Sequence, residues 1–165
     1  MDKLVKNKIK VIGCQIDSPS NKDYILNKLE SYKEMNDIFI QVFNVNMVLN
    51  KEHILWAYDK AKRSLEQNTS RADSLEIETL LWASGERQIK NAIKKMGVPD
   101  HANNAAVLTD AKISDIIEFL DWERDDAILE PSKGKLKKFD ITDEEINSVE
   151  NPYDLIFEKL SVSIL

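Results

Sequence analysis

Cationic side chains recur on one side of the helix that the sequence predicts from about Glu86 to Met96. At about 100° per residue, Arg87, Lys90 and Lys94 follow one outward stripe, with Gln88 at its start. The opposite, inward side takes the apolar residues Ile89, Ala92, Ile93 and Met96. A helix start also offers unpaired backbone N–H groups and a positive dipole end, both of which favour a phosphate or carboxylate. The stripe is therefore a candidate anion site, against the alternative of an ordinary solvated face.

A second basic stripe carries an aromatic ring. On the helix predicted from 50 to 66, the outward side groups His53, Trp56 and Lys60. An indole on a basic face is suited to stacking on an unpaired base, while the neighbouring cations reach the flanking phosphates. The alternative is again a solvated helix face.

The two predicted helices around Gly85 meet at a corner. The apolar run of residues 73–84 stops at Ser84-Gly85, and a glycine inside a helix costs roughly 1 kcal/mol relative to alanine. We therefore expect one helix to end here and another to begin. The break would project a new helix N-terminus beside Arg87, where both could hold an anion.

Two predicted helices carry more apolar surface than one buried face requires. On the helix from 73 to 84, Leu75 and Trp82 lie nearly opposite the main apolar stripe, and on the C-terminal helix Leu155 and Val162 do the same. Such a second face is either covered by a neighbouring segment of the same domain or meets another protein. These four residues are the candidates for a partner surface.

Signatures of catalysis are missing. With four glycines the chain has no phosphate-cradling loop, and it has no GxSxG elbow, HExxH pair or aspartate-rich metal loop. Two histidines and one cysteine make no zinc site, and Cys14, in an apolar run, is predicted to be a buried thiol. We therefore expect no enzyme, no catalytic residue, no metal and no cofactor.

The charge is uneven along the chain. The net charge is −6, but residues 1–97 carry 16 basic and 13 acidic side chains, whereas residues 98–165 carry 7 and 16. Any contact with nucleic acid is therefore expected in the first two-thirds. A basic-then-apolar leader and an apolar stretch of roughly 20 residues are both absent, so we expect a cytoplasmic protein with no membrane contact.

Strand and helix patterns alternate along the chain. Residues 8–16, 37–45 and 105–109 are typical of strands, with helical patterns between and after them. The sequence therefore predicts an α/β or α+β fold: a single domain over residues 1–165, with one small mixed sheet packed by several helices. Residues 121–140 give no clear pattern, except that 132–138 are typical of an exposed loop, and the strand order stays open.

The block of residues 73–97, preceded by 50–62, resembles the small kinase-binding subunit of the KEOPS complex in its archaeal form, a relative of the animal PRPK-binding protein. The residues that carry the resemblance are His53-Ile54-Leu55, Ala57, Glu78, Ala83-Ser84-Gly85, Arg87-Gln88-Ile89, Ala92-Ile93 and Gly97.

This resemblance implies a non-catalytic subunit that binds the amino-terminal lobe of the KEOPS kinase/ATPase. The complex installs threonylcarbamoyladenosine in tRNA, and archaeal family members bind the unpaired 3′ CCA end of that tRNA. Helix geometry then assigns the kinase to Leu75, Trp82, Leu155 and Val162, and the tRNA end to Arg87, Gln88, Lys90 and Lys94, with His53, Trp56 and Lys60 as second choice. A kinase-binding regulator without RNA contact and an unrecognised small enzyme remain as alternatives.

Overall fold

The computed structural model describes residues 8–164, whose contacts form two compact units. We call the first the sheet unit; it holds the described residues up to Val45 together with Val98–Ile128. The second, the helical unit, holds Asn46–Gly97 and the described residues from Leu129 onward. The prediction of one domain over residues 1–165 stays a prediction.

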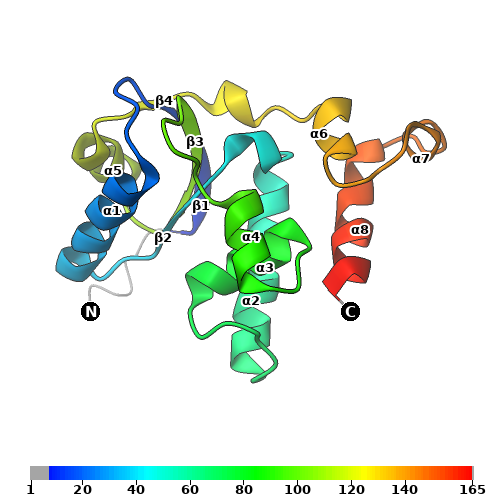
Figure 1. The fold of residues 1–165 in the computed structure, drawn as a ribbon, viewed down its shortest axis with the longest axis horizontal. Coiled ribbons are helices and arrows are strands. Elements are labelled where there is room, and N and C mark those ends of the chain that lie inside the picture. The colour runs from blue at the N-terminus through cyan, green and yellow to red at the C-terminus, as the bar shows by residue number, and fades with distance from the viewer. Residues whose placement is uncertain (1–7, 165) are drawn as a thin grey trace. The chain divides into compact units, whose positions relative to one another are not determined.

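The sheet unit is built on four strands in the order β2-β3-β1-β4 (Figure 1). These strands are β1 (Lys10–Gln15), β2 (Ile40–Phe43), β3 (Asn104–Thr109) and β4 (Glu123–Arg124). The predicted α+β class, with one small sheet packed by helices, is confirmed.

The sheet is antiparallel throughout, so the prediction of a mixed sheet is wrong. A helix joins β1 to β2, so the two strands run in the same direction. A strand–helix–strand order of this kind is typical of two parallel neighbours in a sheet, which is why the sequence predicts a mixed sheet. In the structure β3 lies between them and is antiparallel to both: Val107 is opposite Ile12 on one side and opposite Val42 on the other. The pattern along the chain predicts the strand at residues 105–109, but it does not show that this strand lies between the other two.

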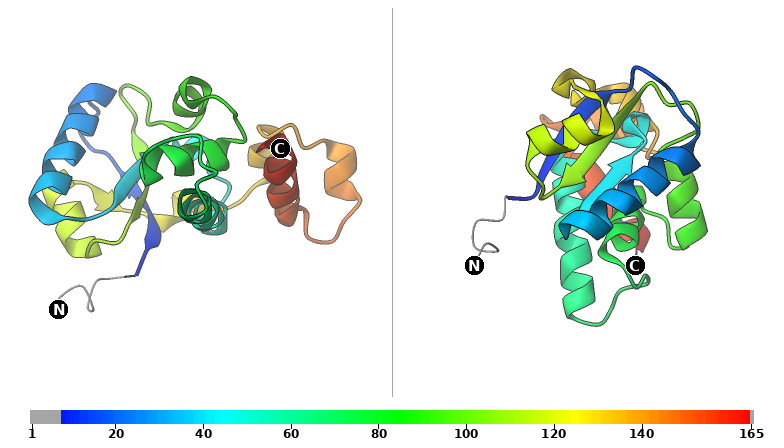
Figure 2. Two further views of the ribbon diagram at one scale, coloured as in Figure 1. Left: turned by 90° about the horizontal axis from the view of Figure 1, so that it is seen from below. Right: turned by 90° about the vertical axis from the view of Figure 1, so that its left-hand side faces the viewer.

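Two helices, α1 (Lys22–Asn36) and α5 (Ile113–Leu120), pack on one face of this sheet (Figure 2). Alternate strand residues point to that face, as the two-residue period of a strand requires. The cluster that they form includes Ile12, Ile25, Leu29, Val107, Ile116 and Leu120.

Cys14 lies in the same cluster and has no exposed surface, which confirms the predicted buried thiol. Burial raises the pKa of Cys14 to about 12, with a further contribution from the nearby Asp126 carboxylate. The thiol is therefore protonated at neutral pH and unreactive.

The segment after α5 is tied to β1 at a glycine. The Asp125 N–H donates to the Gly13 carbonyl at 2.7 Å, and the Gly13 N–H donates to Asp126 Oδ1 at 3.0 Å. A Cβ at position 13 would lie 2.5 Å from the Asp125 carbonyl oxygen, closer than any side chain tolerates. Glycine thus permits the close approach of this segment to β1. The segment contains β4 and, directly after it, the 3-10 helix η3 (Asp126–Leu129).

The helical unit packs α2 (Lys51–Glu66) against α3 (Leu75–Ser84), and α3 against α4 (Ile89–Met96). The C-terminal helix α8 (Leu155–Ile164) packs on α2 and α3, with Ile156 and Leu160 buried. The short 3-10 helices η2 (Val45–Met47) and η4 (Pro152–Asp154) precede α2 and α8.

Two short helices precede η4 along the chain, α6 (Lys133–Lys137) and α7 (Asp143–Asn147). The prediction of an exposed loop over 132–138 is wrong, because Ser132 caps α6 by accepting the Lys135 N–H, and Leu136 is buried. A single buried leucine among lysines and a glycine is too weak a pattern to indicate a helix.

Candidate functional site

Gly85 ends α3, which confirms the predicted break. Its φ is 74°, in the left-handed region where glycine is unstrained, and its N–H donates to the Leu81 carbonyl at 3.1 Å. A Cβ at this position would lie 3.0 Å from Leu160 Cδ2 and 3.4 Å from Ser163 Cβ, both on α8. The corner is therefore a packing point for α8 as well as a helix end.

Arg87 extends from this corner to the end of α8. Its Nε–H donates to the Ser163 carbonyl at 3.2 Å, while the Arg71 guanidinium donates to the Ile164 carbonyl. Both cations lie where the last carbonyls of a helix lack intrahelical partners. Arg87 is exposed, but one of its roles in the structure is to cap α8.

Glu86, which precedes α4, is paired with a lysine near the end of that helix. Lys95 Nζ lies 3.7 Å from its carboxylate and donates to the Ser84 carbonyl at 2.9 Å. The same ammonium lies 4.7 Å from the centre of the Phe139 ring. Lys95 therefore partly neutralises the acidic residue closest to the basic stripe.

The helix α4 begins at Ile89, later than the predicted Glu86. Gln88 is the N-cap residue, and its side chain makes no capping hydrogen bond, so the first-turn N–H groups have no side-chain acceptor from it. Lys90 and Lys94 are exposed, and neither has an ion-pair or hydrogen-bond partner within residues 8–164. The basic stripe thus survives on α4, with its start shifted.

Two residues predicted to face inward on α4 are exposed. Ile89 and Ile93 are 39% and 42% exposed, whereas Ala92 and Met96 are buried. The physical reason is that this short helix packs mainly on α3, and one stripe, Ala92 with Met96, fills that contact. Ile89 and Ile93 therefore add apolar surface beside Lys90 and Lys94.

The prediction that His53 lies on an outward face is wrong. The ring is completely buried; its Nδ1 accepts the Leu49 N–H at 3.1 Å, and its Nε2 lies 2.9 Å from the Ala83 carbonyl oxygen. Burial lowers the pKa of His53 to about 4, and Lys95 and Lys135 lower it further against the effect of the Ala83 hydrogen bond. The neutral ring links α2 to the end of α3 and cannot touch RNA in this structure.

Trp56 packs inward, together with rings from two other helices. Its ring centre lies 5.9 Å from that of Trp82, edge to face, and 5.5 Å from that of Phe157. Lys60 Nζ lies 5.8 Å from the Trp56 ring centre, one helical turn along α2. We call Trp56, Trp82 and Phe157 the aromatic cluster.

The aromatic cluster joins one residue predicted to meet RNA, Trp56, with one predicted to meet a protein, Trp82. Phe157 was not among the candidates, and no signal along the chain could link these three positions, because they come from three helices. All three rings are half-buried, and the Trp82 indole N–H is enclosed without a partner in the described part of the chain.

The outer side of α8 is the most exposed of the candidate partner surfaces. Leu155 and Val162 are seven residues apart and share one side of the helix, away from the buried Ile156 and Leu160. Val162 is 63% exposed, Leu155 is half-buried, and on α3 Leu75 is half-buried as well. None of the four candidates is fully covered.

The described residues offer neither a metal site nor a membrane-spanning helix. No three His, Cys, Asp or Glu side chains within residues 8–164 gather closely enough to hold a metal ion. None of the helices in that range has the length and apolar composition that crossing a bilayer requires.

Comparison with known proteins gives two matches. A family model described as "Kinase binding protein CGI-121" matches residues 16–161. A curated protein named "Regulatory protein Cgi121", from the archaeon Methanocaldococcus jannaschii, is 35% identical over 106 residues, which is 61% of this chain and 70% of that protein.

Proposed function

We propose that this chain, which belongs to the CGI-121 family of kinase-binding proteins, is the kinase-binding subunit of a KEOPS complex and helps to recruit tRNA through its 3′ CCA end. The family is one of non-catalytic regulatory proteins, so the prediction that the chain is not an enzyme is confirmed. The KEOPS role, the RNA contact and a cytoplasmic location are the finer parts of the proposal.

One observation carries the kinase-binding surface: Val162 is exposed on a helix whose inner side is already filled. Ile156 and Leu160 complete the packing of α8, so Leu155 and Val162 contribute little to the unit's own core. An apolar pair on an outer helix face is suited to docking a protein. Leu75 and Trp82, the two candidates on α3, are half-buried, so each keeps part of its apolar surface exposed.

Replacing Val162 with arginine is expected to weaken binding to the cognate kinase about tenfold or more, because a charge would be buried in an apolar contact. Stability should change by about 0.5 kcal/mol or less, since the position is exposed. Isothermal titration of the two purified proteins measures the affinity, and thermal unfolding checks the fold.

The matched control is Val149→Arg, the same change at another exposed valine of the helical unit, 43% exposed and outside α8. The control should keep full affinity. If both variants lose the same amount of affinity, the effect is a general one of added charge. If Val162→Arg binds the kinase with full affinity, the outer side of α8 is not the docking surface.

The support for RNA binding is the exposed face of α4. Lys90 and Lys94 project there without partners in the described chain, Glu86 is paired with Lys95, and Ile89 and Ile93 lie beside the cations. Such a face offers ammonium groups to phosphates and apolar surface to unstacked bases. Arg87 and Gln88 lie at its start.

A double variant, Lys90→Ala with Lys94→Ala, is expected to weaken tRNA binding about tenfold at low salt. The slope of log affinity against log salt concentration should become shallower by about one to two, because two phosphate contacts are lost. Gel shifts with intact tRNA and tRNA lacking CCA measure the effect. Lys62→Ala with Lys133→Ala removes two exposed lysines from other helices and serves as the control. If removal of CCA leaves the affinity unchanged, the recruiting role is wrong and a kinase-binding regulator without RNA contact remains.

A further inference from the structure

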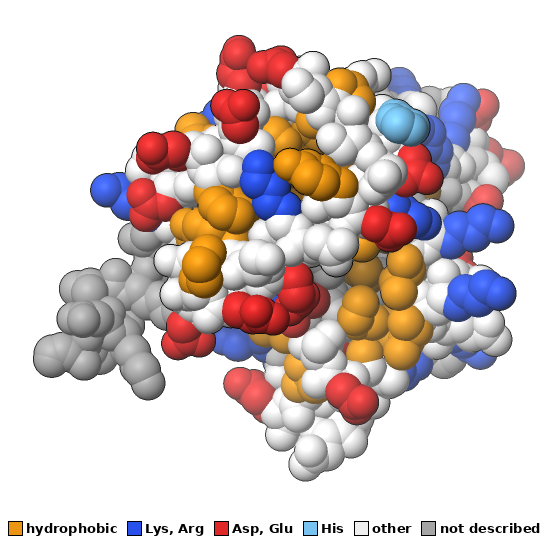
Figure 3. Space-filling view, turned by 60° about the vertical axis from the view of Figure 1, so that its left-hand side comes forward, with side chains coloured by type: hydrophobic (Ala, Val, Ile, Leu, Met, Phe, Trp, Pro, Cys, Tyr) orange, Lys and Arg blue, Asp and Glu red, His pale blue; other side chains and the backbone are white. Residues whose placement is uncertain are grey.

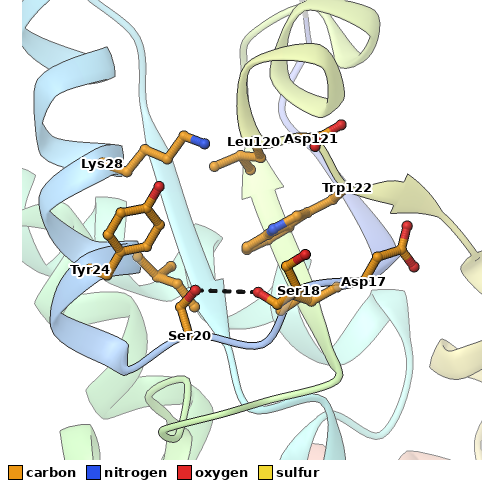
Figure 4. A pocket seen from close by; sticks show the side chains of 10 residues that line it. Asp17, Ser18, Ser20, Tyr24, Lys28, Leu120, Asp121 and Trp122 are labelled. Atoms are coloured by element: carbon orange, nitrogen blue, oxygen red, sulfur yellow. Dashed lines mark hydrogen bonds between the residues drawn. The ribbon is translucent and has the colours of Figure 1, made fainter.

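A cleft of about 180 Å³ opens in the sheet unit between Tyr24 of α1 and Trp122, which follows α5 (Figure 4). Two acidic residues at its rim, Asp17 and Asp121, point away from the opening, and one lysine, Lys28, lies on the α1 side (Figure 4). The face of the molecule in Figure 3 likewise mixes acidic, basic and apolar side chains. Charge therefore selects no class of ligand at this cleft, whereas charged groups are closely paired beside the basic stripe of the helical unit.

The ammonium group of Lys95, near the end of α4, is held by three groups of the helical unit. Its Nζ donates to the Ser84 carbonyl at 2.9 Å, lies 3.7 Å from Glu86 Oε2 and lies 4.7 Å from the centre of the Phe139 ring. The Lys95 side chain is 25% exposed, whereas the preceding Lys94 is exposed. Lys95 therefore serves contacts within its own chain and is poorly placed to bind a phosphate itself.

Glu86 directly precedes Arg87, the first residue of the basic stripe. Its N–H donates to the Ser84 hydroxyl at 3.0 Å, which fixes its backbone at the corner. Among the described residues, Lys95 is the only partner of the Glu86 carboxylate, and no N–H group in the first turn of α4 donates to it. One ion pair thus decides where this acidic side chain lies.

Without the charge of Lys95, the Glu86 carboxylate would turn to other donors of its own chain. The basic stripe of Arg87, Lys90 and Lys94 begins at the next residue, and the first turn of α4 has no side-chain cap. A carboxylate is bound by the same guanidinium, ammonium and N–H groups as a phosphate. Because it is tethered to the same chain, it would compete at a high effective concentration. A released Glu86 would therefore oppose RNA binding.

We propose, on the basis of the RNA contact proposed above for α4, that Lys95 is a positioning residue for RNA binding. Its ammonium holds the Glu86 carboxylate and so keeps an acidic group of the same chain from competing with an RNA phosphate for the basic stripe. Lys95 acts through Glu86 and makes no contact with RNA. The pair thus determines how much of the positive charge of the stripe reaches the ligand.

Four proteins test this role: the unmodified chain, Lys95→Gln, Glu86→Gln and the double variant. Lys95→Gln removes the charge but keeps an N–H donor for the Ser84 carbonyl, and thermal unfolding checks that the variant is folded. Gel shifts with tRNA measure the affinity at about 0.15 M salt, where exposed charges more than about 8 Å apart are largely screened.

Lys95→Gln should bind tRNA about fivefold more weakly, and adding Glu86→Gln should restore the affinity to within about twofold. Glu86→Gln alone should change the affinity by less than about twofold, because its carboxylate is already paired. The control is Lys94→Gln, which removes a charge that meets the RNA directly, so Glu86→Gln should not restore its affinity. If Glu86→Gln raises the affinity by the same factor with and without the Lys95 charge, the two residues act independently and the proposal is overturned.

NMR of the chain without RNA separates failure of the positioning role from failure of the RNA role. In Lys95→Gln, the backbone N–H signals of Lys90 and Asn91, in the first turn of α4, should shift as the freed carboxylate approaches, and the double variant should reverse the shift. Equal shifts in both variants would overturn the proposal, because Glu86 would then have no part in them. If the signals respond to Glu86 but none of the four proteins binds tRNA, the RNA role is wrong and the positioning role falls with it. If tRNA binds but neither the affinities nor the signals depend on Glu86, only the positioning role is wrong.

Discussion

Replacement of Glu78 by alanine is expected to lower the free energy of unfolding by about 3 kcal/mol, a large fraction of the stability of a small domain. The Glu78 carboxylate is 1% exposed; Oε1 accepts the N–H groups of Arg71 and Ala72, both at 3.0 Å, and Oε2 accepts the Ser64 hydroxyl at 2.8 Å. Alanine would leave the backbone donors of the α2–α3 connection without an acceptor.

The loss should extend to α8. Glu78 holds the backbone of Arg71, and the Arg71 side chain donates to the Ile164 carbonyl at the end of that helix. Urea unfolding measures the stability, and amide hydrogen exchange in α8 should become faster in the variant because α8 loses part of its anchor.

Two comparisons isolate the cause. Glu78→Gln keeps a side chain of the same length with one oxygen acceptor, and should lower the free energy of unfolding by about 1 kcal/mol. Glu66→Ala, at an exposed position on α2, should lower it by about 0.5 kcal/mol or less. A loss for Glu78→Ala no larger than that for Glu66→Ala would show that the buried hydrogen bonds contribute little.

The sequence predicted the local elements of the fold well, but not which elements lie next to one another. The helix break at Gly85 and the burial of Cys14 follow from residue type and a short apolar pattern, and both were found. The antiparallel sheet was missed because β3 arrives from a distant part of the chain to lie between β1 and β2. Strand pairing over such separations leaves no mark in either strand's own pattern.

The candidate site shows the same limit. His53 was placed outward because it is polar, although Ala57 and Ala61 recur four and eight residues later on the same buried side of α2. That stripe of small residues was the available signal. The acceptor of the His53 Nε2–H, the Ala83 carbonyl, comes from α3 and could not be found from the helix alone.

Acidification should destabilise the protein through His53. Its pKa is about 4 in the folded chain, and an unfolded histidine has the ordinary value near 6.5. Between these pH values the unfolded chain binds a proton that the folded chain does not, so the free energy of unfolding falls as the pH falls. The neutral His53 ring makes its full contribution to the free energy of unfolding above about pH 6.5. About 3 kcal/mol of that contribution is lost as the pH falls to 4.

Because carboxylates also affect stability in acid, the informative quantity is a difference between proteins. Urea unfolding near pH 7 and near pH 4.5 gives the acid loss for the unmodified chain, for His53→Gln and for His101→Asn, an exposed histidine with a left-handed φ that asparagine tolerates. His53→Gln keeps an N–H donor for the Ala83 carbonyl but does not titrate, so its acid loss should be smaller by about 2 to 3 kcal/mol. His101→Asn should keep the full loss. If His53→Gln loses as much stability in acid as the unmodified chain, the buried neutral imidazole is not the source of the pH dependence.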